Sequence, residues 1–268
     1  MTVLINGKAG NCIATTDRGL QYGDGLFETI AVQNGKCEHW HEHMSRLADG
    51  CQRLNIPAPD TTRLLVEAQQ LYAGKENAVL KIIITRGSGG RGYKSPDPVE
   101  PTRIVSIHPW PSYPAGNIEE GIHLHLCTTQ LSSQPALAGI KHLNRLEQVL
   151  ARNEWHDADI SEGLMSDVDG NIIEGTMSNY FAVSQGELIT PRIANCGVAG
   201  IMRQHILNQA VLHKMTVHER NIQLAELHAA DELFICNSII GVWPVRKFQD
   251  TEYKVVGELT ATIMDGLI

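Results

Sequence analysis

The sequence predicts an α+β protein with two domains. Short apolar runs rich in β-branched residues alternate along the chain with amphipathic segments of helical period. A chain of 268 residues is long enough to bury a core in each of two modest domains. Proline is dense over residues 109–114, as in a connector. We therefore expect an N-terminal α/β domain over residues 1–108, a linker over 109–120 and a C-terminal domain over 121–268.

Composition excludes several classes of function. A formal net charge of −8 leaves no surplus of positive charge to attract nucleic acid or an anionic membrane. The six cysteines are scattered without a Cys-x-x-Cys pair, and the N-terminal residues lack a secretory pattern. No apolar run reaches the length of a membrane span. We expect a soluble protein of the reducing cytoplasm.

Five stretches outline the first domain. An Asn-Gly turn within residues 3–15 predicts an opening hairpin, and the glycine-punctuated segment 16–32 predicts a loop that runs into a strand. Residues 44–54 and 61–72 have the apolar spacing of helices. The continuous β-branched run over residues 78–85 is typical of a buried strand.

A glycine-rich segment follows that strand, from Arg86 to Lys94. It lacks the Lys-Ser/Thr pair and the strand-to-helix context of a P-loop, and the acidic residue of a dinucleotide fingerprint. A flexible lid is therefore the simplest interpretation. Its three cations, Arg86, Arg91 and Lys94, suit a substrate with two negative charges.

The second domain has a comparable mixture of patterns. The predicted elements are a strand over 121–128, a hairpin over 176–190, a helix over 197–207, a short helix over 224–227, a strand over 231–238 and a closing helix over 258–268. The helix after residue 197 is entered at a glycine, so its first backbone N–H groups suit an anion. Many helices begin in this way without binding anything.

One lysine and one glutamate in this domain are the main candidates for chemistry. Lys141 follows small and apolar residues, and the run from Leu143 to Leu150 predicts an amphipathic helix that starts directly after it. Glu174 follows the turn at residues 167–171 and an apolar pair. A fixed amine and a fixed carboxylate are what a pyridoxal phosphate enzyme needs, for the Schiff base and for the ring nitrogen. By spacing alone, both residues are also consistent with an ordinary solvated surface.

The sequence contains two rival candidate sites. Lys81 lies inside the strand at 78–85 and competes for the Schiff-base role, although a lysine there more often extends from a sheet edge and no glutamate segment follows it. His39, His41 and His43 resemble a metal cluster, but no acidic or cysteine partner stands at a familiar offset. We expect no metal site.

Three strings of residues resemble the fold-type IV pyridoxal phosphate family. They are Gly139-Ile-Lys-His-Leu-Asn-Arg-Leu-Glu147, Ile172-Ile-Glu-Gly-Thr-Met-Ser-Asn-Tyr-Phe181 and Tyr22-Gly-Asp-Gly-Leu-Phe-Glu-Thr29. The similarity extends over nearly the whole chain. The family includes branched-chain and D-amino-acid aminotransferases and aminodeoxychorismate lyases.

The resemblance implies a two-domain, homodimeric enzyme with pyridoxal 5′-phosphate at the domain interface. The residues that it assigns to the cofactor are Arg46, Lys141, Glu174, Ile201, Met202 and Ser238. Arg46, within His43-Met-Ser-Arg-Leu47, would bind the phosphate through its forked donors. Backbone amides at Ile201 and Met202, and the hydroxyl of Ser238, would bind it as well. Tyr22, Arg86, Arg91 and Lys94 are the substrate-binding candidates.

Two features favour the lyase branch of the family. Thr29 stands where branched-chain aminotransferases have glycine, and its hydroxyl could relay a proton to a departing group. The loop over residues 86–94 is similar to that of the lyases. The implied reaction converts aminodeoxychorismate to 4-aminobenzoate and pyruvate for folate synthesis, with Lys141 as a base whose pKa is lowered by burial.

An aminotransferase of the same fold is the alternative. Branched-chain members have a tyrosine five residues after the lysine, where this chain has Leu146. D-Amino-acid aminotransferases share more of the pattern around Lys141 and are harder to exclude. A binding protein without turnover would predict the loss of Lys141 or Glu174, and both are present.

Overall fold

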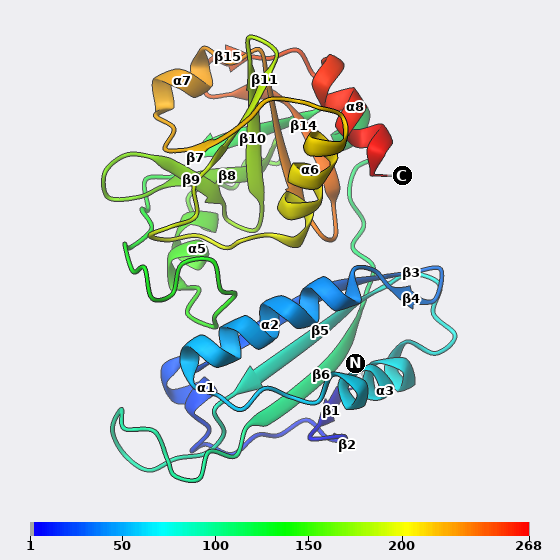
Figure 1. Ribbon diagram of the computed structural model, residues 1–268, viewed down its shortest axis with the longest axis vertical. Coiled ribbons are helices and arrows are strands. Elements are labelled where there is room, and N and C mark those ends of the chain that lie inside the picture. Colours follow the sequence, from blue (N-terminus) through cyan, green and yellow to red (C-terminus); the bar gives the residue numbers. More distant parts are fainter. Residues whose placement is uncertain (1–2, 268) are drawn as a thin grey trace. The chain divides into compact units, whose positions relative to one another are not determined.

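The computed structural model describes residues 3–267 and contains helices and two sheets, which confirms the predicted α+β class (Figure 1). The chain divides into two compact units. The first is Met1–Pro111 with Ile140–Asn144, and the second is Ser112–Gly139 with Arg145–Ile268.

The first unit is built on a six-stranded antiparallel sheet with the order β2-β1-β6-β5-β3-β4. Its strands are β1 (Val3–Ile5), β2 (Lys8–Ala9), β3 (Gly25–Gln33), β4 (Lys36–Cys37), β5 (Ala78–Thr85) and β6 (Thr102–Pro109). Strand β5 pairs along its whole length with β3 on one side and β6 on the other, which confirms the buried strand expected there. The opening hairpin is also present, but β2 is shorter than the predicted 8–15.

The helices of the first unit are α1 (Arg18–Tyr22), α2 (Trp40–Leu54) and α3 (Thr61–Tyr72). Helix α2 packs on β3 and buries Met44, Leu47 and Cys51, the apolar face expected from the sequence. Helix α3 is capped at its N-terminus by Asp60, whose carboxylate accepts hydrogen bonds from the backbone N–H groups of Thr62 and Arg63. Helix α3 therefore starts where its sequence indicates, whereas α2 starts at Trp40, before the predicted apolar run over 44–54.

The second unit contains a nine-stranded mixed sheet with the order β12-β11-β10-β13-β14-β7-β8-β9, and β15 pairs with β14. Its strands are β7 (Ile122–Leu126), β8 (Ile160–Ser166), β9 (Ile172–Gly175), β10 (Asn179–Ser184), β11 (Glu187–Pro191), β12 (Val217–Arg220), β13 (Glu232–Asn237), β14 (Gly241–Phe248) and β15 (Thr251–Glu252). Its helices are α4 (Gly116–Glu119), α5 (Leu146–Arg152), α6 (Ile201–Leu212), α7 (Leu224–His228) and α8 (Glu258–Gly266). The last residue of the predicted closing helix, residue 268, lies outside the described residues.

Strands β10 and β13 are buried on both faces. Tyr180 belongs to one apolar cluster of the unit, and its neighbour Phe181 belongs to another, together with Ile206 of α6 and Ile263 of α8. Successive side chains of a strand point to opposite faces, so both faces of β10 are covered. This explains the nearly continuous apolar run from residue 180 to residue 183.

The prediction for the helix after Lys141 was wrong about where the helix starts. Helix α5 starts at Leu146, five residues beyond the lysine. Its apolar side chains Leu146, Val149 and Leu150 are 76%, 53% and 60% exposed, so they do not pack into the core of the unit. The apolar periodicity correctly predicted a helix, but the apolar face of this helix points to solvent.

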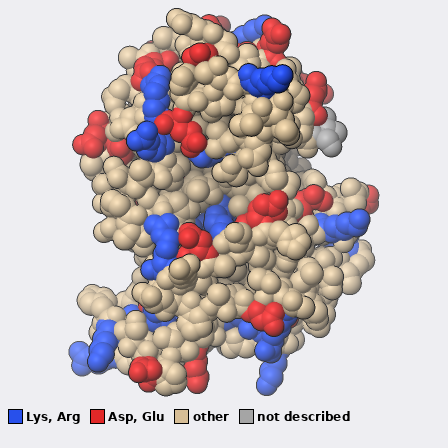
Figure 2. All heavy atoms as spheres, in the orientation of Figure 1, with Lys and Arg blue, Asp and Glu red and all other residues tan. Residues whose placement is uncertain are grey.

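All six cysteines are unpaired. Cys12 is exposed, whereas burial raises the pKa of the other five thiols: to about 11 for Cys37 and Cys51 and to about 12 for Cys127, Cys196 and Cys236. Within residues 3–267, no helix has the length and apolarity needed to cross a bilayer. Figure 2 shows basic and acidic side chains interspersed on the face in view rather than gathered by sign.

Candidate active site

Lys141 lies in a short segment that extends the edge of β3. The backbone N–H of Phe27 donates to the carbonyl of Lys141 (2.9 Å), and that of Leu143 donates to the carbonyl of Gly25 (3.0 Å). The Lys141 ammonium lies 4.6 Å from the centroid of the Phe27 ring. Segment 140–144 thus belongs to the first unit, which differs from the predicted placement of the lysine in a C-terminal domain. Sequence order places it after the linker, but its backbone pairs with β3.

Thr29 and Lys81 lie opposite each other on neighbouring strands. They are paired residues in the β3–β5 register, and Phe27 stands two residues before Thr29 on the same face of β3. The Lys81 ammonium lies 5.4 Å from the Phe27 ring centroid. Both candidate lysines therefore reach the same aromatic ring, and the sheet register brings the predicted proton relay to the same face.

Arg46 is held on the opposite face of β3 by Glu28. Its Nε and Nη2 donate to the two carboxylate oxygens of Glu28 at 2.9 and 2.6 Å, and Nδ1 of His43 lies 2.6 Å from the same carboxylate. Burial on its own would raise the pKa of Glu28, but the charge of Arg46 and the hydrogen bonds from His43 and Arg46 lower it below its ordinary value. Glu28 thus fixes the direction of the guanidinium that is expected to bind phosphate.

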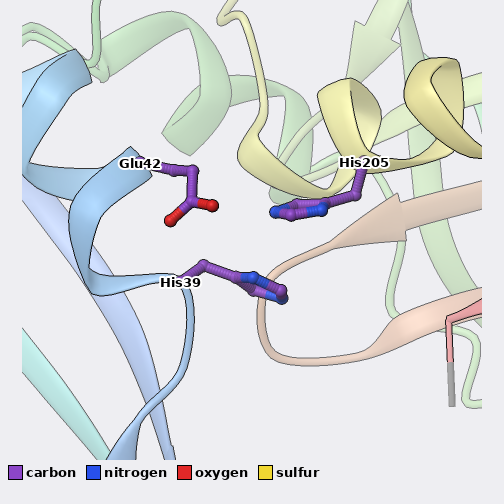
Figure 3. A group of neighbouring side chains, drawn as sticks. All are labelled: His39, Glu42 and His205. Carbon is purple, nitrogen blue, oxygen red and sulfur yellow. The ribbon is translucent and has the colours of Figure 1, made fainter.

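The three histidines near the start of α2 have different surroundings. His43 is buried against Glu28, and His41 is exposed. Figure 3 shows His39 and Glu42 at the N-terminal end of α2, and His205, which belongs to α6 in the second unit. His39 adopts a left-handed backbone (φ 52°) at the helix start. His43 contacts Glu28 through Nδ1, so its ring is oriented by that carboxylate.

The glycine-rich segment contains one buried and two exposed cations. Arg86 is 6% exposed and donates to Asp24 through Nε (2.7 Å) and Nη2 (3.0 Å), and also to the carbonyls of Leu54 and Asn55. The assignment of Arg86 as a substrate ligand stays a prediction. Its guanidinium donates to Asp24, Leu54 and Asn55 of the same unit. Arg91 and Lys94 are exposed.

Arg18 was missed by the sequence analysis. It is 4% exposed, and its Nε donates to Asp24 at 2.8 Å. Its guanidinium also lies 4.9 Å from the ring centroid of Tyr22, which in turn contacts Tyr93 edge-on at 5.4 Å. Burial alone would raise the pKa of Asp24, but hydrogen bonds and charge from Arg86 and Arg18 lower it. The sequence did contain one signal of this cluster, because Asp24 stands between Gly23 and Gly25.

Glu174 is the buried carboxylate of the second unit's site. It is 3% exposed on β9, and its Oε2 accepts a hydrogen bond from the backbone N–H of Val198 at 2.7 Å. Arg145 lies near enough for its charge to interact with Glu174: burial lowers the pKa of Arg145, and the charges of Glu174 and Glu147 oppose that change. The glutamate is therefore fixed on one side by a backbone amide.

The start of α6 lies in the same unit. The helix begins at Ile201 after Gly200, which offers no side chain to accept from the first amides. A Cβ at residue 200 would overlap Oδ1 of Asn179, whose Nδ2 donates to the carbonyl of Val198 at 2.9 Å. Glycine is thus required at the helix start by close packing, and Val198 connects this helix start to Glu174.

Ser238 follows the end of β13 in a turn fixed by Asn237. The Asn237 Oδ1 accepts hydrogen bonds from the N–H groups of Ile239 (2.8 Å) and Ile240 (3.0 Å), and its Nδ2 donates to the carbonyl of Met177 (3.1 Å). The turn that carries Ser238 is therefore connected to the segment that follows Glu174.

That segment is organised by a second glutamate that the sequence analysis missed. Glu162 on β8 is fully buried, and its carboxylate accepts hydrogen bonds from the N–H and hydroxyl of Thr176, the N–H of Met177 and the hydroxyl of Ser178. These donors all lie in the turn between β9 and β10. The turn after Glu174 is folded around one carboxylate.

The chemistry of these groups fits pyridoxal phosphate. A buried carboxylate suits a protonated ring nitrogen, and a helix N-terminus without a capping side chain suits a phosphate. An amine held over an aromatic ring suits covalent attachment. Of the predicted cofactor residues, Glu174, Ile201, Met202 and Ser238 belong to the second unit, and Arg46 and Lys141 belong to the first.

Comparison with known proteins identifies the family. Residues 25–248 match the family model of amino-transferase class IV. The chain is 38% identical over 267 residues to an aminodeoxychorismate lyase of Vibrio harveyi, covering 98% of each chain. It is 30% identical to a putative branched-chain-amino-acid aminotransferase of Methanocaldococcus jannaschii, covering 99% of this chain and 94% of that protein.

A solved structure extends the same comparison. The crystal structure of 4-amino-4-deoxychorismate lyase from Pseudomonas aeruginosa superimposes with a TM-score of 0.94 and 46% sequence identity, covering 99% of this chain and 97% of that one. The fold-type IV architecture implied by the sequence resemblance is thereby confirmed. The chain belongs to the amino-transferase class IV family of pyridoxal phosphate-dependent proteins.

Proposed function

We propose that this protein is a pyridoxal phosphate-dependent aminodeoxychorismate lyase, which converts 4-amino-4-deoxychorismate to 4-aminobenzoate and pyruvate in folate biosynthesis. The observation that carries the proposal is full-length similarity at 38% and 46% identity to two proteins that are named for this activity. Thr29 supports it, because its hydroxyl lies on the β3 face that also presents Phe27.

The cofactor supplies an electron-accepting ring that withdraws electrons from the amine-bearing carbon of the substrate. Lys141 attaches the cofactor and then, as a neutral amine, removes the proton from that carbon. Glu174 keeps a proton on the ring nitrogen. Thr29 donates a proton to the departing enolpyruvyl group, and aromatisation of the six-membered ring favours the products.

The remaining site residues bind rather than react. Arg46, the amides of Ile201 and Met202, and the hydroxyl of Ser238 hold the cofactor phosphate. Substrate carboxylates are bound by cations of the loop between β5 and β6, for which Arg91 and Lys94 are exposed and Arg86 remains a candidate. Tyr22 is proposed to line the substrate site.

Two further observations support a proposal for the assembly and the location. We assign a homodimer, supported by the exposed apolar face of α5, because a large unpaired apolar patch is typical of an interaction surface. A reducing cytoplasm is supported by six unpaired cysteines.

An aminotransferase is the second candidate function. Identity of 30% to a putative branched-chain-amino-acid aminotransferase over nearly the whole chain favours it. Against it, Leu146 is 76% exposed and apolar at the position where that branch has a cofactor-contacting tyrosine.

Supplying aminodeoxychorismate to the cofactor-loaded protein without any keto acid tests the function. We expect equimolar 4-aminobenzoate and pyruvate over many turnovers, because aromatisation needs no amino acceptor. Thr29→Gly should lower kcat by about 100-fold, the size of a lost general acid, whereas Thr29→Ser keeps the hydroxyl and most of the rate.

A different result of the same assay would support the aminotransferase. Absence of 4-aminobenzoate, together with conversion of the cofactor to its amine form by D- or L-amino acids, would identify an aminotransferase.

A further inference from the structure

The loop between β5 and β6 is attached to the segment before α1 along its first arm (Figure 1). The N–H of Arg18 donates to the carbonyl of Gly87 at 2.9 Å, and the N–H of Gly89 donates to the carbonyl of Thr16 at 3.1 Å. The hydroxyls of Thr16 and Ser88 are 3.1 Å apart. A Cβ at Gly87 (φ +83°) would overlap the carbonyl oxygen of Glu100, so this arm also requires glycine.

The second arm is held in a different way, by the side chain of Arg18. Its Nη1 donates to the carbonyls of Gly92 (3.0 Å) and Lys94 (3.4 Å), and its Nη2 donates to the carbonyl of Tyr93 (3.1 Å). Three consecutive carbonyl oxygens thus converge on one buried guanidinium.

At the tip of the loop and along the second arm, little packs against the chain apart from Arg18 and Tyr22. A Cβ at Gly90 or Gly92 would meet no atom within 4 Å, and Gly92 has a left-handed backbone (φ +90°). Tyr93 is 85% exposed. A glycine-rich backbone of this kind has high conformational entropy when it is not restrained. The conformation that presents Arg91 and Lys94 therefore depends on the restraint from Arg18.

The direction of Arg18 is itself fixed by Asp24. The Nε of Arg18 and the Nε of Arg86 share Asp24 Oδ2 at 2.8 and 2.7 Å, and Arg86 is anchored on the last carbonyls of α2. The planar guanidinium of Arg18 can donate to Asp24 and to the loop carbonyls at the same time. The compact ammonium group of a lysine cannot reach both.

We infer that Arg18 is a positioning residue for substrate recognition: it fixes residues 92–94 so that Arg91 and Lys94 are presented to a dianionic substrate. The inference rests on the proposed function for the identity of that substrate. Arg18 acts through the loop, because its side chain donates to Asp24 and to the carbonyls of residues 92–94. Its loss should weaken substrate binding without releasing the cofactor.

Limited trypsin digestion of the cofactor-loaded protein tests the restraint without relying on activity. Cleavage after Arg91 and Lys94 requires local opening of the loop. In Arg18→Lys we expect cleavage at these two bonds to accelerate by about 10-fold, because several charge-assisted hydrogen bonds are lost. The KM for aminodeoxychorismate should rise by a similar factor, while kcat and cofactor absorbance stay within about twofold.

Arg103→Lys is the matched control. Arg103 lies in the same unit and donates through Nε and Nη2 to Glu67 at 2.7 and 2.6 Å, but it does not bind the 92–94 carbonyls. It should leave loop cleavage and KM unchanged. Equal cleavage rates in wild type and Arg18→Lys would overturn the inference, as would the same acceleration in Arg103→Lys.

If Arg18→Lys does not fold, Asp24→Asn decides the question, because it removes the carboxylate that orients Arg18 and keeps the side-chain size. Faster cleavage after Arg91 and Lys94 supports the inference, and unchanged cleavage overturns it. Failure of the wild type to release 4-aminobenzoate would defeat the proposed function, whereas the digestion result would still decide what Arg18 does.

Discussion

Two lysines reach the same aromatic ring, and the chemistry depends on which of them binds the cofactor. Lys141 and Lys81 lie 4.6 and 5.4 Å from the centroid of Phe27. Lys81 is anchored in the middle of a central strand, whereas Lys141 is in a five-residue segment at the edge of β3. A lysine that must attach a cofactor and then move a proton is better served by the less constrained backbone.

Borohydride reduction of the cofactor-loaded protein, followed by peptide mapping, should therefore label Lys141. Lys81→Met should keep the label, and Lys141→Met should abolish it, because the amine is the attachment group. A label recovered on Lys81 in the wild type would contradict the assignment.

At this scale the sequence pointed to candidate reacting groups but not to the residues that support them. Lys141, Glu174 and Thr29 stand within strings similar to the family. Glu28 could have been noticed, since a charged residue inside the apolar stretch from Gly25 to Val32 is unusual. The loop contacts of Arg18 and the turn contacts of Glu162 could not, because those partners lie 74–76 and 14–16 residues away and are brought near only by the fold.

Among the elements, α2 and β3 are joined by a buried ionic cluster as well as by apolar packing. Glu28 is 1% exposed and receives both His43 and Arg46 from α2. A folded-state pKa below the ordinary value means that the contribution of Glu28 to stability is complete above about pH 4.5 and is lost as the pH falls below it.

Glu28→Gln in the cofactor-free protein should lower the free energy of unfolding by about 3–5 kcal/mol, because Arg46 keeps a buried charge without its counterion. The variant should also lose less stability than the wild type between pH 5.5 and pH 3.5. Urea unfolding at both pH values measures this, with exposed Glu76→Gln as a control expected to behave like the wild type. A Glu28→Gln protein with the wild-type pH dependence would refute the argument.

The elements that the sequence predicted most accurately are those whose pattern reflects burial within one unit, such as α3 and β5. The start of α5 was missed because residues 140–144 pair with β3, which no local pattern reveals. The exposure of its apolar stripe could not be predicted, because periodicity alone cannot tell an internal core from a surface that meets another molecule.

The whole molecule is proposed to be a homodimer, and α5 offers the test. Leu150→Glu places a charge on the exposed apolar face of α5. We expect light scattering after size exclusion to show a mass reduced toward that of one chain, because a buried unpaired charge is costly at an interface. Val66→Glu on α3, where Val66 is 49% exposed, should keep the wild-type mass. An unchanged mass for Leu150→Glu would exclude this face from the dimer contact.

For the molecule as a whole, the sequence predicted the α+β class and a division near the proline-rich connector. It did not predict the mixed order of the nine-stranded sheet, in which β7 pairs in parallel with β8 and β14. That order is set by contacts between strands far apart in sequence, such as β7 and β14.

Because residues 140–144 belong to the first unit, neither unit corresponds to one continuous stretch of the gene. A fragment ending at residue 111 would expose the backbone edge of Gly25 and Phe27, which pairs with that segment in the intact chain. The complementary fragment would contain five residues without their native neighbours. Cutting the gene at the linker would therefore yield two interdependent pieces, and co-expression rather than separate production is the sensible way to study them.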